Sequence, residues 1–253
     1  MIRKTAPFLI VLLSSAVARA DGRPLVEESR NVGEFNGIRV TSGIVAHVRE
    51  GTRGPIAIKG EAAALKRLRL EINADHVLEV KYASSNEPLA VQQATVVTIQ
   101  VPRVASLAAS GGATIDASVP VESSIVLAAA GGAELYLRRP LTADRVTVAA
   151  SGGSRMVIAG IEAKDAEIAL NGGARVSVSG RADEVELQIA GGATLEAQGL
   201  TTGSLHVAGA SGAEAAVRAG RASGALAGAR LRLPASAQTS IAEAAGAEVV
   251  KDL

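Results

Sequence analysis

A pair of adjacent glycines returns along this chain at an almost constant interval. The second glycines of the pairs, and of the shorter forms that continue them, lie 20, 21, 20, 19, 20 and 16 residues apart. The series is Gly111-Gly112, Gly131-Gly132, Gly152-Gly153, Gly172-Gly173, Gly191-Gly192, Ser211-Gly212 and the weaker Ala227-Gly228. A fixed period of this length is typical of a stacked repeat, in which each unit packs mainly on its neighbours.

Apolar and polar residues alternate on both sides of each glycine pair. In the first repeat the aliphatic Leu107 precedes the pair, and the aliphatic Ile115 follows it between the polar Thr114 and Asp116. Later repeats keep aliphatic residues in the same columns. Alternation with a period of two predicts strands with one buried face. Each repeat is therefore predicted to run as strand, glycine corner, strand and polar connection.

Two architectures can join strands in this way. In a meander of hairpins, a two-residue loop would place Leu107 opposite Asp116 and mix apolar with charged residues on one face. A three-residue loop removes that conflict, so the meander stays an alternative. Small residues such as Ala109, just before the corner, suit a coil whose walls converge. The pattern favours an all-β fold: a parallel β-helix or solenoid-like stack with rungs of ~20 residues that turn at Gly-Gly corners.

The regularity of the pattern divides the rest of the chain. Residues 1–20 begin with a basic pair, continue with an apolar run too short for a membrane anchor, and end in Ala18-Arg19-Ala20, as a secretory signal peptide does. The expected segments are a signal peptide over 1–20 cleaved between Ala20 and Asp21, an N-terminal linker over 21–34, a less regular β region over 35–101, the repeat β-solenoid over 102–235 and a C-terminal tail or cap over 236–253. A short helix over Glu61–Leu68 and a loop over 83–93 are expected inside the less regular region.

Composition limits the classes of partner. Arg3, Lys4 and Arg19 would leave with the signal peptide, so the 26 basic residues fall to 23 against 25 acidic ones. Such a balance predicts no binding to nucleic acid. No later apolar run is long enough for a transmembrane segment, and no cysteine is available for disulfides. The expected location is the periplasm or the extracellular space.

The residues that could carry chemistry are scattered. His47, His76 and His206 do not have the spacing of a metal site. Asp116, Glu134 and Glu196 are the candidate acids of a carbohydrate-active enzyme, which would need a pair of carboxylates across a groove. However, each rung places a different residue type in their columns.

Simpler structural roles are expected for the charged residues. Glu134 lies one rung from Arg155, so the two are predicted to form an ion pair. Three aspartates in the connections, Asp144, Asp165 and Asp183, are expected to be turn formers. No catalytic, cofactor-binding or metal-binding residue is predicted.

One column of small residues is expected to point outward before the corners. It consists of Ala108, Ala128, Ala149, Ala169 and Ala208, and beside it lie Ser110, Ala130, Ser151, Asn171 and Ala190. A flat, uncharged strip of this kind suits self-association or docking of an envelope or surface partner. The alternative is that residues 35–101 or the tail cover it within the same chain.

Three features in this order resemble the GIN domain, the head domain of auto-transporter adhesins. They are "FNGIRVTSGIVAHVREG" near the start, the junction "VPRVASLAASGGATI", and the repeated "SGGA", "AGGA" and "SGA" corners, and the likeness extends over roughly residues 33–235. The resemblance implies an exported all-β stack without an established activity. We therefore expect a non-enzymatic binding or scaffold module of the cell envelope, with adhesin-like function, and keep a polysaccharide lyase or hydrolase on a β-helix scaffold as the alternative.

Overall fold

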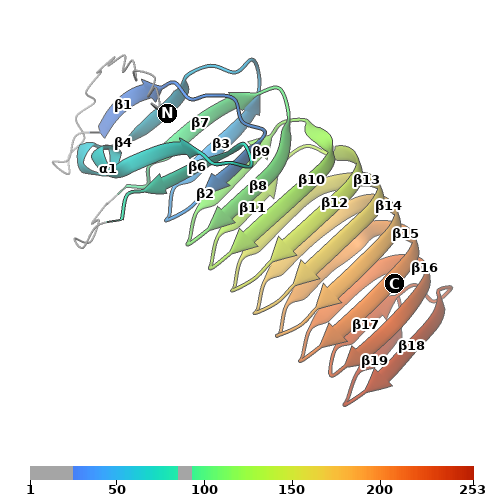
Figure 1. Cartoon of the computed structure of the whole chain (residues 1–253). Helices are drawn as coiled ribbons and strands as arrows, with labels where there is room; N and C mark the ends of the chain where they lie inside the picture. Colours follow the sequence, from blue (N-terminus) through green and yellow to red (C-terminus); the bar gives the residue numbers. More distant parts are fainter. Residues whose placement is uncertain (1–24, 85–92) are drawn as a thin grey trace, which may run out of the picture.

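Parallel pairing between successive repeats defines the fold (Figure 1). The computed structural model describes residues 25–84 and 93–253, and in it each repeat lies beside the next in register. Ala128 neighbours Ala149, which neighbours Ala169, and the strands that carry them run in the same direction. Hairpins would make neighbouring strands antiparallel. The structure therefore confirms the predicted β-solenoid, whereas the predicted signal peptide over 1–20 and most of the loop expected over 83–93 lie outside the described residues.

The repeat region consists of strands that stack in two series, one before and one after each corner. The strands are β8 (Val104–Ser110), β9 (Thr114–Ser118), β10 (Val121–Ala130), β11 (Glu134–Leu137), β12 (Leu141–Ala150), β13 (Arg155–Leu170), β14 (Arg175–Ile189), β15 (Thr194–Ala210), β16 (Glu214–Ala227), β17 (Arg230–Leu233), β18 (Gln238–Ala244) and β19 (Glu248–Lys251). In β13, β14, β15 and β16, the segment after one corner continues as a single long strand to the next corner. Aliphatic side chains of both series meet between them and form one elongated core.

Each corner is a tight turn that glycine makes possible. Gly111 and Gly112 have φ values of 59° and 73°, and the N–H of Ala113 donates to the C=O of Ser110 at 3.2 Å. Positive φ at both central residues defines a type I′ turn. The turns are also bonded to one another, since the N–H of Gly112 donates to the C=O of Gly131 at 3.1 Å. Glycine therefore serves both the turn and the stacking of turns.

The corner series extends beyond the glycine pairs on both sides. It begins one level earlier, at Ser42-Gly43, and ends with Ala245-Gly246. Ser42, Ser211 and Ala245 adopt positive φ without being glycine. The last rung also differs inside, because Glu243 and Lys251 stand in register with the buried Leu226 and Leu233. Charged groups thus replace aliphatic ones where the core meets water at the C-terminal end.

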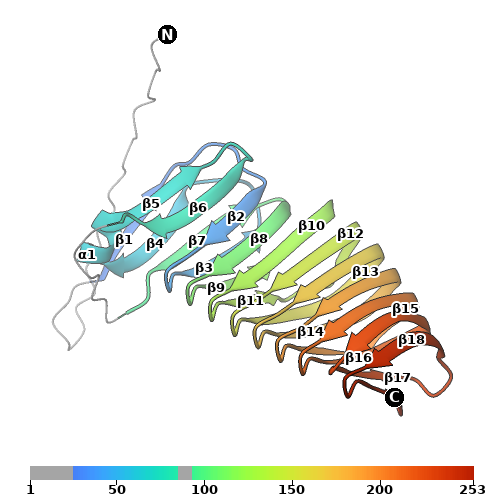
Figure 2. The same cartoon turned by 60° about the horizontal axis from the view of Figure 1, so that its bottom comes forward.

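The N-terminal end is closed by antiparallel strands (Figure 2). Its elements are β1 (Leu25–Arg30), β2 (Gly37–Val40), β3 (Val45–Glu50), β4 (Ile56–Glu61), α1 (Ala62–Arg67), β5 (Leu68–Ile72), β6 (Val77–Tyr82) and β7 (Val96–Val101). Strands β2 and β3 form a rung that pairs in parallel with β8 and β9. The pairs β1–β4, β4–β7 and β5–β6 are antiparallel. The less regular region therefore continues the same sheet system.

Two local expectations can be compared with these elements. Helix α1 falls inside the predicted helical range Glu61–Leu68. The segment 21–34, expected to be a linker, contains strand β1. The sequence did not predict β1 because apolar and polar residues do not alternate along it. Five of its six residues are partly buried, and the side chains of Glu28 and Arg30 form an ion pair at 2.5 Å.

An alanine at the first position of a corner should destabilise the protein, because its backbone must adopt a positive φ and its Cβ approaches the backbone of the neighbouring turn. In Gly191→Ala, the new Cβ would lie 2.9 Å from the backbone nitrogen of Gly172 at a φ of 64°. We expect the free energy of unfolding to fall by about 1–3 kcal/mol, measured by chemical denaturation. The matched control is Gly54→Ala, where a Cβ has nothing within 4 Å and φ is not positive. Equal losses in the two variants would contradict this account of the corners.

Candidate functional site

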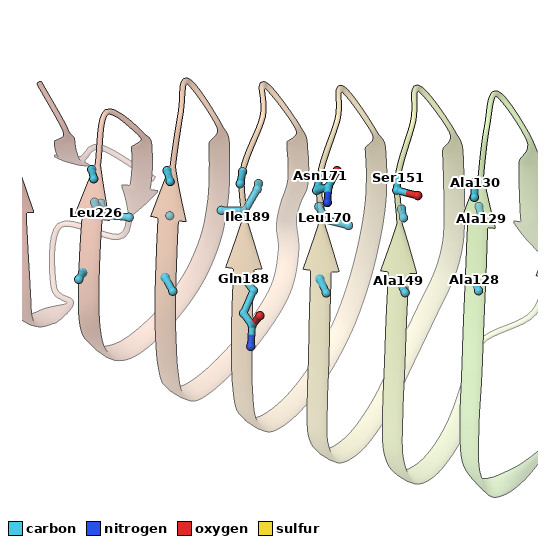
Figure 3. Close-up of a pocket in the computed structure, with 18 of the residues that line it drawn as sticks. Ala128, Ala129, Ala130, Ala149, Ser151, Leu170, Asn171, Gln188, Ile189 and Leu226 are labelled. Carbon is cyan, nitrogen blue, oxygen red and sulfur yellow. The ribbon is translucent and has the colours of Figure 1, made fainter. Parts of the chain in front are cut away.

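A long shallow trough follows the outward face of the strands that precede the corners (Figure 3). Its floor is a column of residues in parallel register, one per rung. In chain order they are Arg39, Ala108, Ala128, Ala149, Ala169, Gln188, Ala208, Ala225 and Ala242. We call this feature the alanine trough; its volume is about 930 Å³. The predicted outward column is therefore present, and it is longer than expected, with Gln188 interrupting the alanines.

The alanine trough is open to solvent along the described chain. Ala108, Ala128, Ala149 and Ala169 are half-buried by their strand neighbours, and Ala208 is exposed. The alternative expectation, that residues 35–101 or the tail cover the strip, is not what the described residues show. Residues 35–101 form the N-terminal end of the stack, and β18 adds a further rung to the trough.

The chemistry of the trough is almost entirely apolar. Beneath its floor lie aliphatic side chains of the core, among them Leu170, Ile189 and Leu226. Among the described residues that line it, Arg39 is the one that is charged, and it lies at the N-terminal end. The trough thus offers a hydrophobic surface of small residues with a cation at one end.

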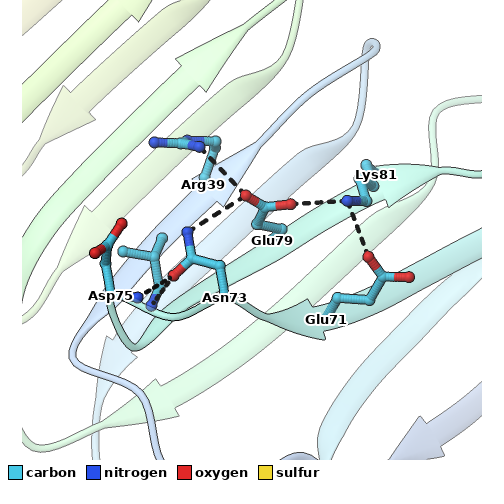
Figure 4. A network of polar contacts seen from close by, with 7 residues as sticks. Arg39, Glu71, Asn73, Asp75, Glu79 and Lys81 are labelled. Carbon is cyan, nitrogen blue, oxygen red and sulfur yellow. Dashed lines mark hydrogen bonds and ion pairs between the residues drawn. The ribbon is translucent and has the colours of Figure 1, made fainter.

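Arg39 is held by a polar network on the outer face of β2 and β6 (Figure 4). Its guanidinium donates to the Glu79 carboxylate at 3.2 Å, and the Lys81 ammonium donates to the other carboxylate oxygen at 2.8 Å. The hydrogen bond from Lys81, opposed by partial desolvation and aided by Arg39 and Asn73, keeps the pKa of Glu79 below its usual value. Glu79 is therefore ionised at neutral pH, and its carboxylate holds the side chains of Arg39 and Lys81 in place.

Two of the three candidate acids of a carbohydrate-active enzyme, Asp116 and Glu196, lie far apart. Asp116 and Glu196 occupy one outward column on the strands after the corners, four rungs apart. At about 4.8 Å per rung this is roughly 19 Å, well beyond the ~10 Å limit for a glycosidase carboxylate pair. Glu134 lies one rung from Asp116, in the next outward column, and its carboxylate accepts a hydrogen bond from the Tyr136 hydroxyl at 3.1 Å.

Asp116 is neutralised by two arginines. The Arg49 guanidinium contacts one of its carboxylate oxygens at 3.0 Å, and that of Arg138 contacts the other at 2.9 Å. Burial opposes the charge on Asp116, but the hydrogen bonds from Arg138 and Arg49 outweigh it and lower the pKa of this carboxyl. Such an arrangement stabilises a carboxylate and makes it a poor acid catalyst at neutral pH.

The predicted ion pair between Glu134 and Arg155 is wrong, although the two residues are register neighbours as expected. Within residues 25–84 and 93–253, no nitrogen of Arg155 comes within 4.0 Å of the Glu134 carboxylate, whose hydrogen bond comes from Tyr136. The expectation that Asp144, Asp165 and Asp183 form turns is wrong, because they lie within the strands β12, β13 and β14. They contact cations there: Asp144 contacts Lys164 at 2.7 Å, Asp165 contacts Arg145 at 3.7 Å, and Asp183 contacts Arg181 at 3.4 Å. Because all are exposed, they form a solvated charged edge.

The histidines lie in three separate places. His47 is on β3 beside Asp116, His76 is in the turn before β6 with a φ of 57°, and His206 contacts the Ser223 hydroxyl at 3.2 Å on β15. The described part of the chain contains no group of three or more His, Asp or Glu side chains able to hold a metal ion. Sequence reasoning missed four residues of the trough floor, namely Arg39, Gln188, Ala225 and Ala242. The register of Gln188 with Ala169 and Ala208 could have revealed it, since the glycine alignment fixes that column.

Comparisons with known proteins agree with this architecture. The profile of the family described as "Putative auto-transporter adhesin, head GIN domain" matches residues 34–229. No curated protein matches the chain significantly. Within the described residues, no helix has the length and apolar character needed to span a membrane.

Several solved structures share the fold. A putative adhesin from Parabacteroides merdae superposes with a TM-score of 0.75 at 18% identity, covering 92% of this chain and 98% of its own. A putative adhesin from Parabacteroides distasonis gives 0.75 at 21% identity, and a protein described as a putative lipid binding protein from the same species gives 0.80 at 13%, each with the same coverage. At these identities, the likeness establishes a common fold.

The arginine clamp on Asp116 should be visible as a pH-dependent contribution to stability. Asp116→Asn is expected to lower the free energy of unfolding by about 1 kcal/mol at neutral pH, because the arginines are partly exposed. A carboxyl whose pKa is lower in the folded state stabilises above its unfolded pKa of about 4, and that contribution disappears as the pH falls through the folded value. Denaturation at neutral pH and near pH 3 should show the difference shrinking toward zero. Asp183→Asn, in an exposed pair, should be nearly neutral at both, and an undiminished effect of Asp116→Asn in acid would refute the clamp.

Proposed function

Because this chain belongs to the family of GIN head domains of auto-transporter adhesins, we propose that it is an exported, non-enzymatic binding or scaffold module of the cell envelope. Residues 1–20 support the export step, since they have the composition of a signal peptide with cleavage between Ala20 and Asp21. Cleavage there would release the stack into the periplasm or the extracellular space. In this proposal the solenoid is a rigid scaffold, and its outer surface binds the partner.

The alanine trough is the observation that carries this proposal. The largest apolar patch on a typical monomeric protein covers about 300–600 Å² and is often a functional site, and the alanine trough is a patch of this size. This one runs the length of the stack, and its register is fixed by the same parallel pairing that holds the rungs together. A linear apolar partner therefore meets a rigid, preformed surface.

The dimensions of the trough favour a narrow envelope partner over a second copy of the chain. A strip three residues wide and nine rungs long measures roughly 10 by 38 Å. Its area of roughly 380 Å² is less than half of the ~800 Å² per partner in a standard protein interface. A thin extended ligand fills such a strip, and its apolar character suits an acyl chain or a linear apolar segment. A structural neighbour described as a putative lipid binding protein is consistent with this class of ligand.

The enzymatic alternative is the weaker proposal. A groove of about 520 Å³ does carry the carboxylates of Asp144, Glu162 and Asp183, but Lys164 and Arg181 also line it and pair with Asp144 and Asp183. A glycosidase needs two carboxylates across a groove, whereas the described lining of the alanine trough contains no acidic residue. Asp116 is clamped by arginines, and Glu196 is four rungs away. We therefore propose no catalytic role for either of them.

The proposal predicts that charges in the trough abolish envelope binding. In Ala149→Lys/Ala169→Lys, two ammonium groups on neighbouring rungs would have to be desolvated beneath an apolar partner, so binding should fall at least tenfold. The measurement is co-sedimentation of the labelled protein with an envelope fraction of the source organism. The matched control, Val157→Lys/Ser177→Lys, places the same charges on neighbouring rungs of the opposite face and should bind like the native protein. Equal binding by all three proteins would overturn the role of the trough.

A further inference from the structure

Strand β5 is paired along one edge and free along the other. It forms an antiparallel hairpin with β6, in which Leu68 faces Tyr82 and Leu70 faces Val80. It is the outermost strand of its layer at the N-terminal end of the stack (Figure 2). Within the described chain, no second strand pairs with it. A free strand edge is a template for pairing with another chain.

The alternation of backbone hydrogen bonds shows which groups the free edge presents. The N–H of Ala83 donates to the C=O of Arg67, and that of Asn73 donates to the C=O of Val77, so odd-numbered residues of β5 face β6. Even-numbered residues face outward. At Leu68 the N–H is used by α1 and the C=O accepts a hydrogen bond from Arg30 at 2.8 Å. Leu70 and Ile72 are left to offer both their N–H and their C=O groups.

The charges on β5 are mismatched within their own chain. Arg69 lies directly opposite Lys81, and Glu71 lies directly opposite Glu79, so each faces a like charge. Glu71 finds a diagonal partner in Lys81 at 2.9 Å (Figure 4). Arg69 donates to the backbone oxygens of Lys66 and Leu68, and over residues 25–84 and 93–253 no acidic side chain comes within 4.0 Å of its guanidinium. Arg69 is exposed on the free edge strand without an anionic partner.

We propose that two copies of this protein pair edge to edge through β5, antiparallel and about a two-fold axis at Leu70. In this register Arg69 of each copy lies opposite Glu71 of the other, while Leu68 lies opposite Ile72 on the inner face. The two Leu70 residues exchange their N–H and C=O groups across the two-fold axis. Moving the two-fold axis by one residue, from Leu70 to Glu71, would set Glu71 against itself. Charge therefore selects the register.

A groove beside β5 can receive the partner's apolar side chains. It has a volume of about 450 Å³ and lies between β1, α1 and β5, with Val26, Leu65 and Leu70 among its apolar lining. The inner-face side chains of an added strand, Leu70 and Ile72 of the second copy, would point toward the same layer as those of β5. The added strand would thus cover apolar surface as well as complete a ladder.

The opposite end of the stack lacks these properties. There the inward positions carry Glu243 and Lys251, and pairing a second copy over them would bury charge. The N-terminal edge carries leucine and isoleucine at the corresponding inner positions. Edge pairing is therefore assigned to β5 and not to β18 or β19.

Charge reversal tests the proposed dimer by sedimentation equilibrium of the purified chain. The native protein should have twice the monomer mass. Arg69→Glu sets glutamates against each other and Glu71→Arg sets arginines against each other, so each variant alone should dimerise about tenfold more weakly. An equimolar mixture of the two variants restores both opposite-charge contacts and should form a heterodimer. A misfolded variant could not be rescued in this way.

Two controls separate this dimer from other contacts. Arg181→Glu reverses a similarly exposed arginine in the repeat and should leave the mass unchanged. Ala149→Lys/Ala169→Lys should also remain dimeric, so loss of trough binding and loss of the dimer are distinguishable. A monomeric native protein, single variants that dimerise like the native one, or a mixture that stays monomeric would each overturn the proposal.

Discussion

The backbone hydrogen bond between one corner and the next is the interaction on which the rest of the structure depends. The N–H of Gly112 donates to the C=O of Gly131, and the same contact recurs from Gly132 to Gly152 and from Gly153 to Gly172. A side chain at the first corner position would approach the backbone of the preceding turn, as the Cβ distance of 2.9 Å at Gly191 shows. Because the turns are bonded directly, every rung bends at the same height, and residues at equal distances from the corner fall into columns.

The inward columns contain the residues that stabilise the fold, and the outward columns contain the residues that can bind a partner. Inward columns are aliphatic and fully enclosed, as at Leu107, Leu127 and Leu187. The outward column of alanines contributes little to the core, so its small size is not required by packing beneath it. Its position on a rigid, straight ladder makes it a preformed surface, and the arginine-clamped Asp116 on the other face is held as a fixed charge. The stack thus has the properties of a scaffold with specialised faces and ends.

Much of this architecture follows from the sequence, because glycine pairs and alternating residues report backbone geometry directly. The solenoid, the buried columns and the outward alanines could all be predicted in this way. The terminal corners at Ser42-Gly43 and Ala245-Gly246 could not, since serine and alanine are poor markers of positive φ. The expected contact between Glu134 and Arg155 failed for another reason: register places two residues side by side, but rotamers and competing partners such as Tyr136 decide which polar groups meet.

Parallel stacking at one rung per repeat is most directly tested by the distance between two spin labels. The chain has no cysteine, so labels can be attached to Ala128→Cys/Ala225→Cys, two positions of one outward column. Five rungs at about 4.8 Å predict a backbone separation of roughly 24 Å. A meander of hairpins uses two strands per repeat and would place the same positions roughly 48 Å apart. Electron–electron double resonance distances near the shorter value support the stack, and distances near the longer one would contradict it.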